Sequence, residues 1–527
     1  MKITEKIHSY IRFYDDEVKV LAINLMVNVL AKNSENNSSV SLSTVFLNEP
    51  MVIWSISILL NIIKEDLGKI KLKIRCMDIF SSIMKNSEEM QNIFYNLDGV
   101  DSALRELKST YTEEKLKEIE DSLKSIKTSK NKKSEREKVF ILEKDDESNY
   151  LSLSNNSSSK MLSSQVFNVE HYVDLDQTSE YRRSILDCLS SAASMKEDSR
   201  RRIIESKELS LILRLLDETS SKMLLSTART ILSLSRAHLS FKKYLHEYDI
   251  TSWLLKLVNH PSIEVQIAFT NSLCNFLLDY SSNTNEVLDC ITKILKILNS
   301  TKHNKIRFNC IFSIKNILYY ISSNLSGNSN RDLKRQIMRK ITYECLLNLL
   351  EDDDNSIVEQ VLLIFRVLLY KTSEDIEEVF SNCKTKLLKK IEEKLSAIHC
   401  STPDITLQSL YILCNISAGA EKYKAVITDE RSGFMSKVST YVDSSNLNFK
   451  SVSVLILNNL IISEKDREKQ NDSANESKLE LFKKFNLISK LERIASEEDG
   501  SEIKQNSVLI LEKLKVYRRK EIDINKI

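Results

Sequence analysis

Apolar residues recur along most of the chain with the spacing of an α-helix, and in places a second stripe runs beside them. In LQSLYILCNISAGAEKYKAVI (residues 407–427), Leu410 and Leu413 belong to the apolar stripe. Tyr411 and Asn415 lie four residues apart, one helical turn, on a neighbouring strip of the same predicted helix. A stripe of this kind is informative only if it recurs on other helices.

The same arrangement does recur when Asn415 is used as an anchor. Residues ten before, two before and one after it are Ile405, Leu413 and Ile416, and apolar residues occupy these offsets around further anchors. From Ser191 to Asn459, neighbouring anchors are 41 to 51 residues apart, close to the period of armadillo and HEAT repeats. The other anchors are Asn28, Ser82, Ser191 (a weaker match), Ser233, Asn275, Asn316, Val367, Asn459 and Lys513.

A short apolar segment and a polar turn precede several of these long helices, as in ITSWLLKLV followed by NHPS (residues 250–262). The chain has 527 residues but only 6 Gly and 3 Pro, which favours helices joined by short connections. The pattern predicts an all-α fold: an armadillo/HEAT-type, right-handed superhelical solenoid of about nine to ten repeats. Stacking of each repeat on its neighbours would bury one continuous core.

One stretch departs from the pattern. Residues 128–177 are rich in Lys, Ser and Asn and keep no helical period, so we expect a disordered insertion there. It would separate N-terminal armadillo repeats (1–127) from C-terminal repeats (178–517), with a tail at 518–527. The basic stretch 127–138 has two interpretations, a solvated linker and, less simply, a nuclear-import signal.

Charge and hydropathy restrict the partners. The chain has 76 Lys and Arg against 74 Asp and Glu, a net charge of +2, so no nucleic-acid partner is expected. The most apolar run, MVIWSISILLNII (51–63), is shorter than the ~20 residues of a membrane span, and the N-terminal residues lack the pattern of a signal peptide. We expect no membrane partner and a cytoplasmic and nuclear location.

Motifs for catalysis or metal binding do not occur in the sequence. The nine cysteines form no CxxC pair and read as core residues of a reducing compartment, and the seven histidines are dispersed. No GxxxxGK[ST], HExxH or GxSxG motif occurs. The prediction is that the protein is not an enzyme and has no catalytic residue, metal, cofactor or small-molecule substrate.

The second stripe is the candidate binding surface, because the long helices of such a solenoid line its concave groove. An amide at the anchor presents a donor and an acceptor that can clamp the main chain of another protein. The alternative interpretation is that each Asn has a structural role and forms a hydrogen bond to a neighbouring repeat. The predicted partner-binding residues are Arg229, Ser233, Arg236, Asn271, Asn275, Phe312, Asn316, Tyr320, Tyr370, Tyr411, Asn415 and Asn459.

Consecutive repeats resemble, in order, the armadillo repeat-containing protein eight family, the armadillo scaffold of the GID/CTLH ubiquitin-ligase complex. The resemblance covers roughly residues 15–127 and 178–517. The stretches that carry it are DETSSKMLLSTARTILSLSRA (217–237), SLCNFLLDYS (272–281), LLEDDDNSIVEQVLLIFRVLLYKTSEDIEEVF (349–380), LQSLYILCNISAGAEKYKAVI (407–427) and FKSVSVLILNNLIIS (449–463).

The resemblance implies a non-catalytic adaptor that promotes ubiquitin-dependent protein degradation. Such a protein docks on LisH/CTLH scaffold subunits and holds a substrate receptor in its groove, while RING subunits, contacted indirectly, carry the chemistry. Tyr411 and Asn415 lie in the best-matching repeat. Family members generally begin with several more repeats than the two long helices that precede the insertion here.

Other armadillo hubs remain alternatives. A nuclear-import adaptor of the importin-α type pairs each groove Asn with a Trp that holds lysine side chains, whereas this chain has only Trp54 and Trp253. A β-catenin-like hub has a strongly basic groove, whereas the stripe here mixes Arg, Asn, Tyr and Leu. Both classes of protein therefore have groove residues that differ from those of the predicted stripe.

Overall fold

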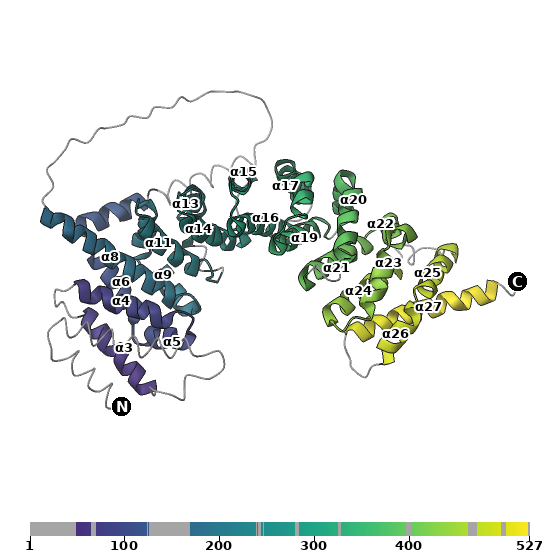
Figure 1. Ribbon diagram of the computed structural model, residues 1–527, viewed down its shortest axis with the longest axis horizontal. Helices are drawn as coiled ribbons and strands as arrows, with labels where there is room; N and C mark the ends of the chain where they lie inside the picture. The colour runs from purple at the N-terminus through teal and green to yellow at the C-terminus, as the bar shows by residue number, and fades with distance from the viewer. Residues whose placement is uncertain are drawn as a thin grey trace, which may run out of the picture. The chain divides into compact units, whose positions relative to one another are not determined.

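The computed structural model divides the chain into two compact units, unit 1 (Met1–Phe276) and unit 2 (Leu277–Ile527). Every regular element in the described part of the chain is a helix (Figure 1). The structure describes residues 49–64, 70–123, 125, 169–238, 240, 244–245, 247–279, 284–324, 328–370, 372–396, 402–461, 472–496 and 502–524.

Unit 1 contains helices of two lengths, and residues 113–123 are also helical. Its elements are α3 (Glu49–Lys64), α4 (Ile70–Met84), α5 (Glu88–Asn96), α6 (Gly99–Ser109), α8 (Val169–Ala192), α9 (Glu197–Glu205), α10 (Leu209–Arg214), the 3-10 turn η2 (Leu215–Asp217), α11 (Ser221–Leu234), α13 (Ile250–Leu257) and α14 (Ile263–Phe276).

Unit 2 continues the same alternation. Its elements are the 3-10 turn η3 (Leu277–Asp279), α15 (Thr284–Ser300), α16 (Asn304–Asn324), α17 (Asn328–Ile341), α18 (Tyr343–Leu349), α19 (Asn355–Leu368), α20 (Ser373–Ser396), α21 (Pro403–Ser417), α22 (Glu421–Thr428), the 3-10 turn η4 (Glu430–Ser432), α23 (Phe434–Val442), α24 (Leu447–Ile461), α25 (Asp472–Lys484), α26 (Leu487–Ser496) and α27 (Glu502–Ile524).

The repeating element has three helices, two before each third helix, where the sequence pattern showed only one. In unit 2 the sets are α17, α18 and α19; α22, α23 and α24; and α25, α26 and α27. In one repeat the first two helices are joined as α20, with a break in helical geometry at Cys383 (φ −151°, ψ 17°). The first helices escaped the sequence analysis because some, such as α17 (NSNRDLKRQIMRKI), are mostly polar.

The third helices pack on one another in chain order. In unit 1, α4 packs on α8, α8 on α11 and α11 on α14; in unit 2, α16 packs on α19, α19 on α21, α21 on α24 and α24 on α27 (Figure 1). This succession is that of an all-α armadillo-type solenoid, as predicted. Residues on one strip of these helices are therefore brought into a row within each unit.

The anchor pattern identified core residues at most anchors, although Ile503 and Leu511 around the anchor Lys513 are half-buried. Around Val367, both Ile357 and Phe365 are fully buried, and around Asn415, Leu413 and Ile416 are fully buried. Burying one such side chain contributes about 1.5–3 kcal/mol, so the repeated column makes stacking the main source of stability. The anchor Asn28 lies outside the described residues.

The insertion interrupts a repeat rather than separating two repeats. Helices α5 and α6 come before it, α8 comes after it, and α8 packs on both as well as on α4. The predicted boundary at residue 178 is corrected, because α8 already begins at Val169. No Gly or Pro occurs between residues 169 and 192 to end a helix there. Residues 126–168 lie outside the described part of the chain.

The predicted tail at 518–527 is also shortened, because α27 continues to Ile524. Its last turns carry no Gly or Pro, so the helix has no signal to stop at residue 517. Residues 525–527 are outside the described ranges.

Seven of the eight described cysteines are buried, as the sequence indicated. Burial raises the pKa of the Cys76 thiol to about 12 and that of Cys414 to about 11, so both remain protonated at neutral pH. Across the described ranges, no helix combines the length and the apolar character that a membrane crossing requires. Within the same ranges, no three His, Cys, Asp or Glu side chains gather in a way that could hold a metal ion.

Candidate functional site

The candidate site is a strip of the third helices that we call the ladder face. It consists of the anchor residues, called rungs, and the residues four positions before them. In unit 1 these are Ser82, Ser191, Ser233 and Asn275 with Asp78, Asp187, Arg229 and Asn271; in unit 2 they are Asn316, Val367, Asn415 and Asn459 with Phe312, Leu363, Tyr411 and Leu455.

In unit 2 the ladder face is an accessible, largely apolar strip. Leu363, Tyr411 and Leu455 are each half-buried, as are the rungs Asn415 and Asn459, although the positions flanking them on the helices are buried. Among the described rungs of unit 2 named above, Asn316 is different, with only 1% of its surface exposed. The strip can therefore contact another molecule through side chains that are not fully buried in the core.

The rung amides donate hydrogen bonds to the preceding third helix. Asn415 Nδ2 donates to the main-chain carbonyl oxygen of Arg366 at 3.0 Å. Asn459 Nδ2 donates to Ser417 Oγ at 3.1 Å and lies 3.4 Å from the carbonyl oxygen of Cys414. Asn275 Nδ2 donates to Ser235 Oγ at 2.8 Å. The structural role that the sequence left open as an alternative is therefore present at these three rungs.

These bonds, which we call staples, use two acceptor positions. One is the carbonyl of the residue just before the preceding rung, as with Arg366 and Cys414; the other is a Ser hydroxyl two residues after that rung, as with Ser235 and Ser417. Ser233 makes the first kind of staple too, because its Oγ donates to the carbonyl of Ser190 at 2.9 Å. A rung can therefore be either Ser or Asn without losing the staple.

Two aromatic residues of the strip form cation–π contacts with cationic side chains of this chain. The Arg366 guanidinium lies 3.8 Å from the centroid of the Tyr411 ring and donates to Gln408 Oε1 at 3.0 Å. The Lys315 ammonium lies 4.0 Å from the centroid of the Phe312 ring. Cation–π contacts prefer the ring face, so one face of each ring is already occupied.

The remaining predicted site residues differ in accessibility. Arg236, two residues past the end of α11, is exposed, and Asn271 on α14 is half-buried. Tyr370, two residues past the end of α19, is 52% exposed, and Tyr320 on α16 is half-buried. The structure thus groups Arg229, Ser233, Arg236, Asn271 and Asn275 in unit 1, and the other seven residues in unit 2. Their role in partner binding stays a prediction.

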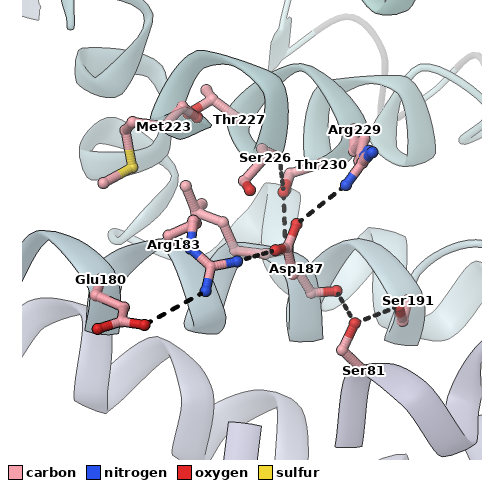
Figure 2. A network of polar contacts seen from close by, with 11 residues as sticks. Ser81, Glu180, Arg183, Asp187, Ser191, Met223, Ser226, Thr227, Arg229 and Thr230 are labelled. Carbon is pink, nitrogen blue, oxygen red and sulfur yellow. Dashed lines mark hydrogen bonds and ion pairs between the residues drawn. The ribbon is translucent and has the colours of Figure 1, made fainter. Parts of the chain in front are cut away.

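In unit 1 the strip is charged, and its centre is Asp187, which the sequence analysis missed. Figure 2 shows Asp187 between Arg183 and Arg229: the nearest oxygen–nitrogen distances are 3.2 Å to Arg183 and 3.9 Å to Arg229. On the other side, Ser81 Oγ donates to the main-chain carbonyl of Asp187 at 3.2 Å and lies 3.1 Å from Ser191 Oγ. Asp187 stands four residues before Ser191, so the same spacing could have found it had Ser191 been a stronger anchor.

The environment of Asp187 disfavours its charge. Burial raises the pKa of its carboxyl, and the Asp78 carboxylate acts in the same direction, although a hydrogen bond from Ser226 and the charges of Arg183 and Arg229 oppose both. A pocket of about 460 Å³ adjoins it between α8 and α11. Three carboxylates (Asp176, Glu180, Asp187) and three cations (Arg183, Lys222, Arg229) line this pocket, so it has no net preference for either sign.

The sequence is similar to curated armadillo proteins. Over 295 residues, 56% of this chain, the sequence is 26% identical to Armadillo repeat-containing protein 8 of Danio rerio, of which the match covers 42%. Over 282 residues, 52% of this chain, it is 24% identical to GID complex subunit 5 of Schizosaccharomyces pombe (strain 972 / ATCC 24843), of which the match covers 33%. The match thus spans about two fifths or less of these relatives' length. No family model matches the chain.

A solved structure of an engineered protein has the same fold, with a TM-score of 0.63 and 13% sequence identity over 98% of this chain and 99% of the other. At this identity the likeness concerns the fold alone. The curated relatives confirm the resemblance predicted from the sequence, at modest identity and over 282 to 295 residues. Its wider extent, over residues 15–127 and 178–517, stays a prediction.

Proposed function

We propose that this chain is a non-catalytic scaffold subunit of a GID/CTLH-type ubiquitin-ligase complex that holds another protein on its ladder face. The observation that carries the proposal is the similarity to Armadillo repeat-containing protein 8 and to GID complex subunit 5. In this role the chain positions a substrate for degradation while other subunits transfer ubiquitin.

Within the complex, the partner held on the ladder face is the substrate receptor. LisH/CTLH subunits form the scaffold on which the chain docks, and RING subunits are reached only indirectly. A half-buried apolar strip with polar rungs, as found in unit 2, is suited to a protein partner. The buried, protonated thiols of Cys76 and Cys414 are poor nucleophiles, which agrees with a binding role.

The main alternative, an import adaptor, fits the strip less well. An importin-α-type groove holds lysine side chains against ring faces. Here Arg366 already covers the Tyr411 ring and Lys315 covers the Phe312 ring. An incoming lysine would meet a like charge at each of these rings, which costs free energy. The geometry therefore favours a partner that is not basic.

Affinity purification of the tagged full-length chain from cells that express it, with mass-spectrometric identification of its companions, tests the proposal. We expect subunits with LisH and CTLH domains and RING subunits. Recovery of import receptors or their cargo in place of these subunits would overturn the ligase role. Imaging of the same tagged chain checks the expected cytoplasmic and nuclear location.

A further inference from the structure

We infer that unit 2 has a second docking site, a cavity between α17, α18 and α20 that receives an acidic side chain of a protein partner. The cavity has a volume of about 530 Å³, and its lining residues lie on these three helices or on the connection between α17 and α18. Ion pairs join α17 to α20, which lie side by side in Figure 1. None of the lining residues is on a third helix, so the inference goes beyond the proposed function and concerns a different surface from the ladder face.

The cavity has a buried floor and an exposed mouth. Met338, Leu347 and Cys383 line it and are each only 5% or 6% exposed. Arg339 and Asn382 also line it and are exposed. A site for a small molecule usually encloses about 70–90% of the ligand surface, whereas a mouth ringed by exposed side chains leaves the entrance open. This shape suits a side chain that enters from a larger molecule whose backbone stays outside.

The carboxylates of the lining already have cationic partners. Glu378 Oε2 lies 2.9 Å from Arg335 Nε. Glu344 Oε2 lies 2.8 Å from Lys386 Nζ. Arg339, in contrast, has no acidic partner among the residues that the structure describes. An entering carboxylate therefore finds a cation, whereas an entering lysine or arginine finds carboxylates that are already paired.

Hydrogen-bond donors without an acceptor favour the same ligand. The guanidinium of Arg339 carries several N–H donors, and the hydroxyl of Tyr343, which also lines the cavity, has no acceptor within the described ranges. Both oxygens of a carboxylate accept, and together they can take parallel bonds from one guanidinium. A phosphate group carries about twice the charge, so the carboxylates of Glu344 and Glu378 would repel it more strongly.

The backbone is irregular on two sides of the cavity. Thr342, the connection between α17 and α18, has φ 66° and ψ 141°. Cys383 is the residue at which α20 departs from helical geometry. Both residues line the cavity. Elsewhere in the described chain, four residues that directly precede a helix also have a positive φ, but they are of types that tolerate it: Asp98, Asp249, Gly433 and Asn486.

Thr342 is strained where those four residues are not. A β-branched residue with a positive φ is a conformational outlier that costs free energy. Its side chain helps to hold this conformation, because Oγ1 accepts a hydrogen bond from the main-chain N–H of Cys345 at 3.2 Å. Strained backbone is concentrated at binding sites and at switch regions. The strain therefore points to this cavity independently of its charges.

Neighbouring residues supply matched controls on both helices. Arg339 lines the cavity, while Lys340, the next residue of α17, is also exposed and does not line it. Arg339→Gln and Lys340→Gln remove the same charge from the chain, but only the first removes it from the cavity. Asn382→Trp fills the mouth of the cavity, while Ser381→Trp places the same ring on α20 outside the lining.

The experiment measures binding of the purified full-length chain to an array of short peptides that carry one Glu among Leu, Ser and Gly. Each peptide has copies with Gln, Lys or phosphoserine in place of Glu, and binders are titrated in solution. We expect the Glu peptides to bind and the Gln and Lys copies to bind about tenfold more weakly or worse.

The variants should separate the cavity from the surface around it. Arg339→Gln and Asn382→Trp should each weaken binding of a Glu peptide about tenfold or more. Lys340→Gln and Ser381→Trp should change it less than about twofold, because each alters an exposed position outside the cavity. All four positions are exposed, so the thermal midpoints should stay near that of the parent chain.

Several results would overturn the inference: no Glu peptide bound, equal binding of the Glu and Gln copies, or tighter binding of the phosphoserine copy. Equal effects of Arg339→Gln and Lys340→Gln, or parent-like binding by Asn382→Trp, would do so as well. Free glutamate is the last arm of the test. If it displaces the peptide at an equal concentration, the cavity is a small-molecule site and not a docking site for a protein.

Discussion

The two units place different chemistry at equivalent positions of one scaffold. In unit 1 the rung Ser233 is buried, and the residues four before the rungs include the charged pair Asp187 and Arg229. In unit 2 the rung Asn415 is half-exposed and Leu363 and Tyr411 occupy the earlier position. The staple is common to both units, so the hydrogen bond to the preceding third helix fixes the donor atom of each rung. The residue type of the rung and its exposure can still vary. Recognition can therefore differ along a solenoid without a change of fold.

One ion pair between outer helices of unit 2 and one of unit 1 differ in their burial. In unit 2, Lys334 on α17 pairs with Asp375 on α20 at 3.4 Å, and the side chains of both are only 9% exposed. In unit 1, Arg202 on α9 pairs with Asp101 on α6 at 2.7 Å, with side-chain exposures of 56% and 30%. A buried pair is sensitive to loss of one partner, while an exposed pair is screened by solvent.

The largest effect should come from the core and should remain within one unit. Phe80→Ala in unit 1 and Phe365→Ala in unit 2 each remove a fully buried ring. Each should cost about 3–5 kcal/mol, mainly in its own unit, because repeats contact chiefly their neighbours. Hydrogen–deuterium exchange resolved along the sequence measures this. Equal loss of protection in both units would show that the chain unfolds as one.

The second largest difference in stability should come from the two ion pairs between outer helices. Asp375→Ala takes the carboxylate away from the buried Lys334 ammonium and should cost unit 2 about 3 kcal/mol or more. Asp101→Ala, its counterpart in unit 1, should cost under about 1 kcal/mol, because the Arg202 side chain is mostly exposed. Chemical denaturation of both variants provides the comparison. Similar losses would mean that burial does not set the value of these pairs.

The staples should contribute alike in both units. Ser233→Ala leaves the Ser190 carbonyl without its donor, and Asn415→Ala does the same to the Arg366 carbonyl. Each should cost about 1–2 kcal/mol. Asn415→Ser should recover most of that loss. A Ser variant as unstable as the Ala variant would show that the shorter side chain does not reach the carbonyl.

The smallest effect should be a pH dependence confined to unit 1. Because burial raises the pKa of Asp187, the folded chain holds its proton to a higher pH than the unfolded chain does. This carboxyl therefore costs stability as the pH rises from about 4 through its raised pKa, and the cost is absent at lower pH.

Asp187→Asn should accordingly have a thermal midpoint equal to or above that of the parent at pH 7.5, with the gap closing toward pH 4. Thermal scans across this range measure it. A lower midpoint for the variant at pH 7.5 would mean that the ion pairs with Arg183 and Arg229 outweigh the cost of burial.

The fold was predictable because buried apolar residues recur with the period of the repeat. Leu413 and Phe365 are buried where the anchor offsets place them, since the same stacking geometry recurs in every repeat. The polar first helices carry little of that signal, so α5 and α6 went unrecognised as the start of the repeat that α8 completes. The sequence pattern predicts residues that face the core. It does not predict helices whose apolar face is narrow.

The candidate site was predictable in position but not in orientation. The spacing placed Asn415 and Tyr411 on one strip correctly. Which end of the Asn415 amide faces outward depends on a carbonyl at Arg366, 49 residues earlier. Likewise, the Arg366 guanidinium over the Tyr411 ring comes from the preceding third helix. Contacts between helices decide both features, and no spacing within one helix contains them.

The interrupted repeat affects how the chain folds during synthesis and how it responds to cleavage. Helices α5 and α6 bury their apolar sides against α8, which the ribosome completes only after the intervening residues have been made. Until then the first repeats lack their closing surface. Once α8 has docked, proteolytic nicking between residues 126 and 168 would leave two fragments that remain together without a peptide link.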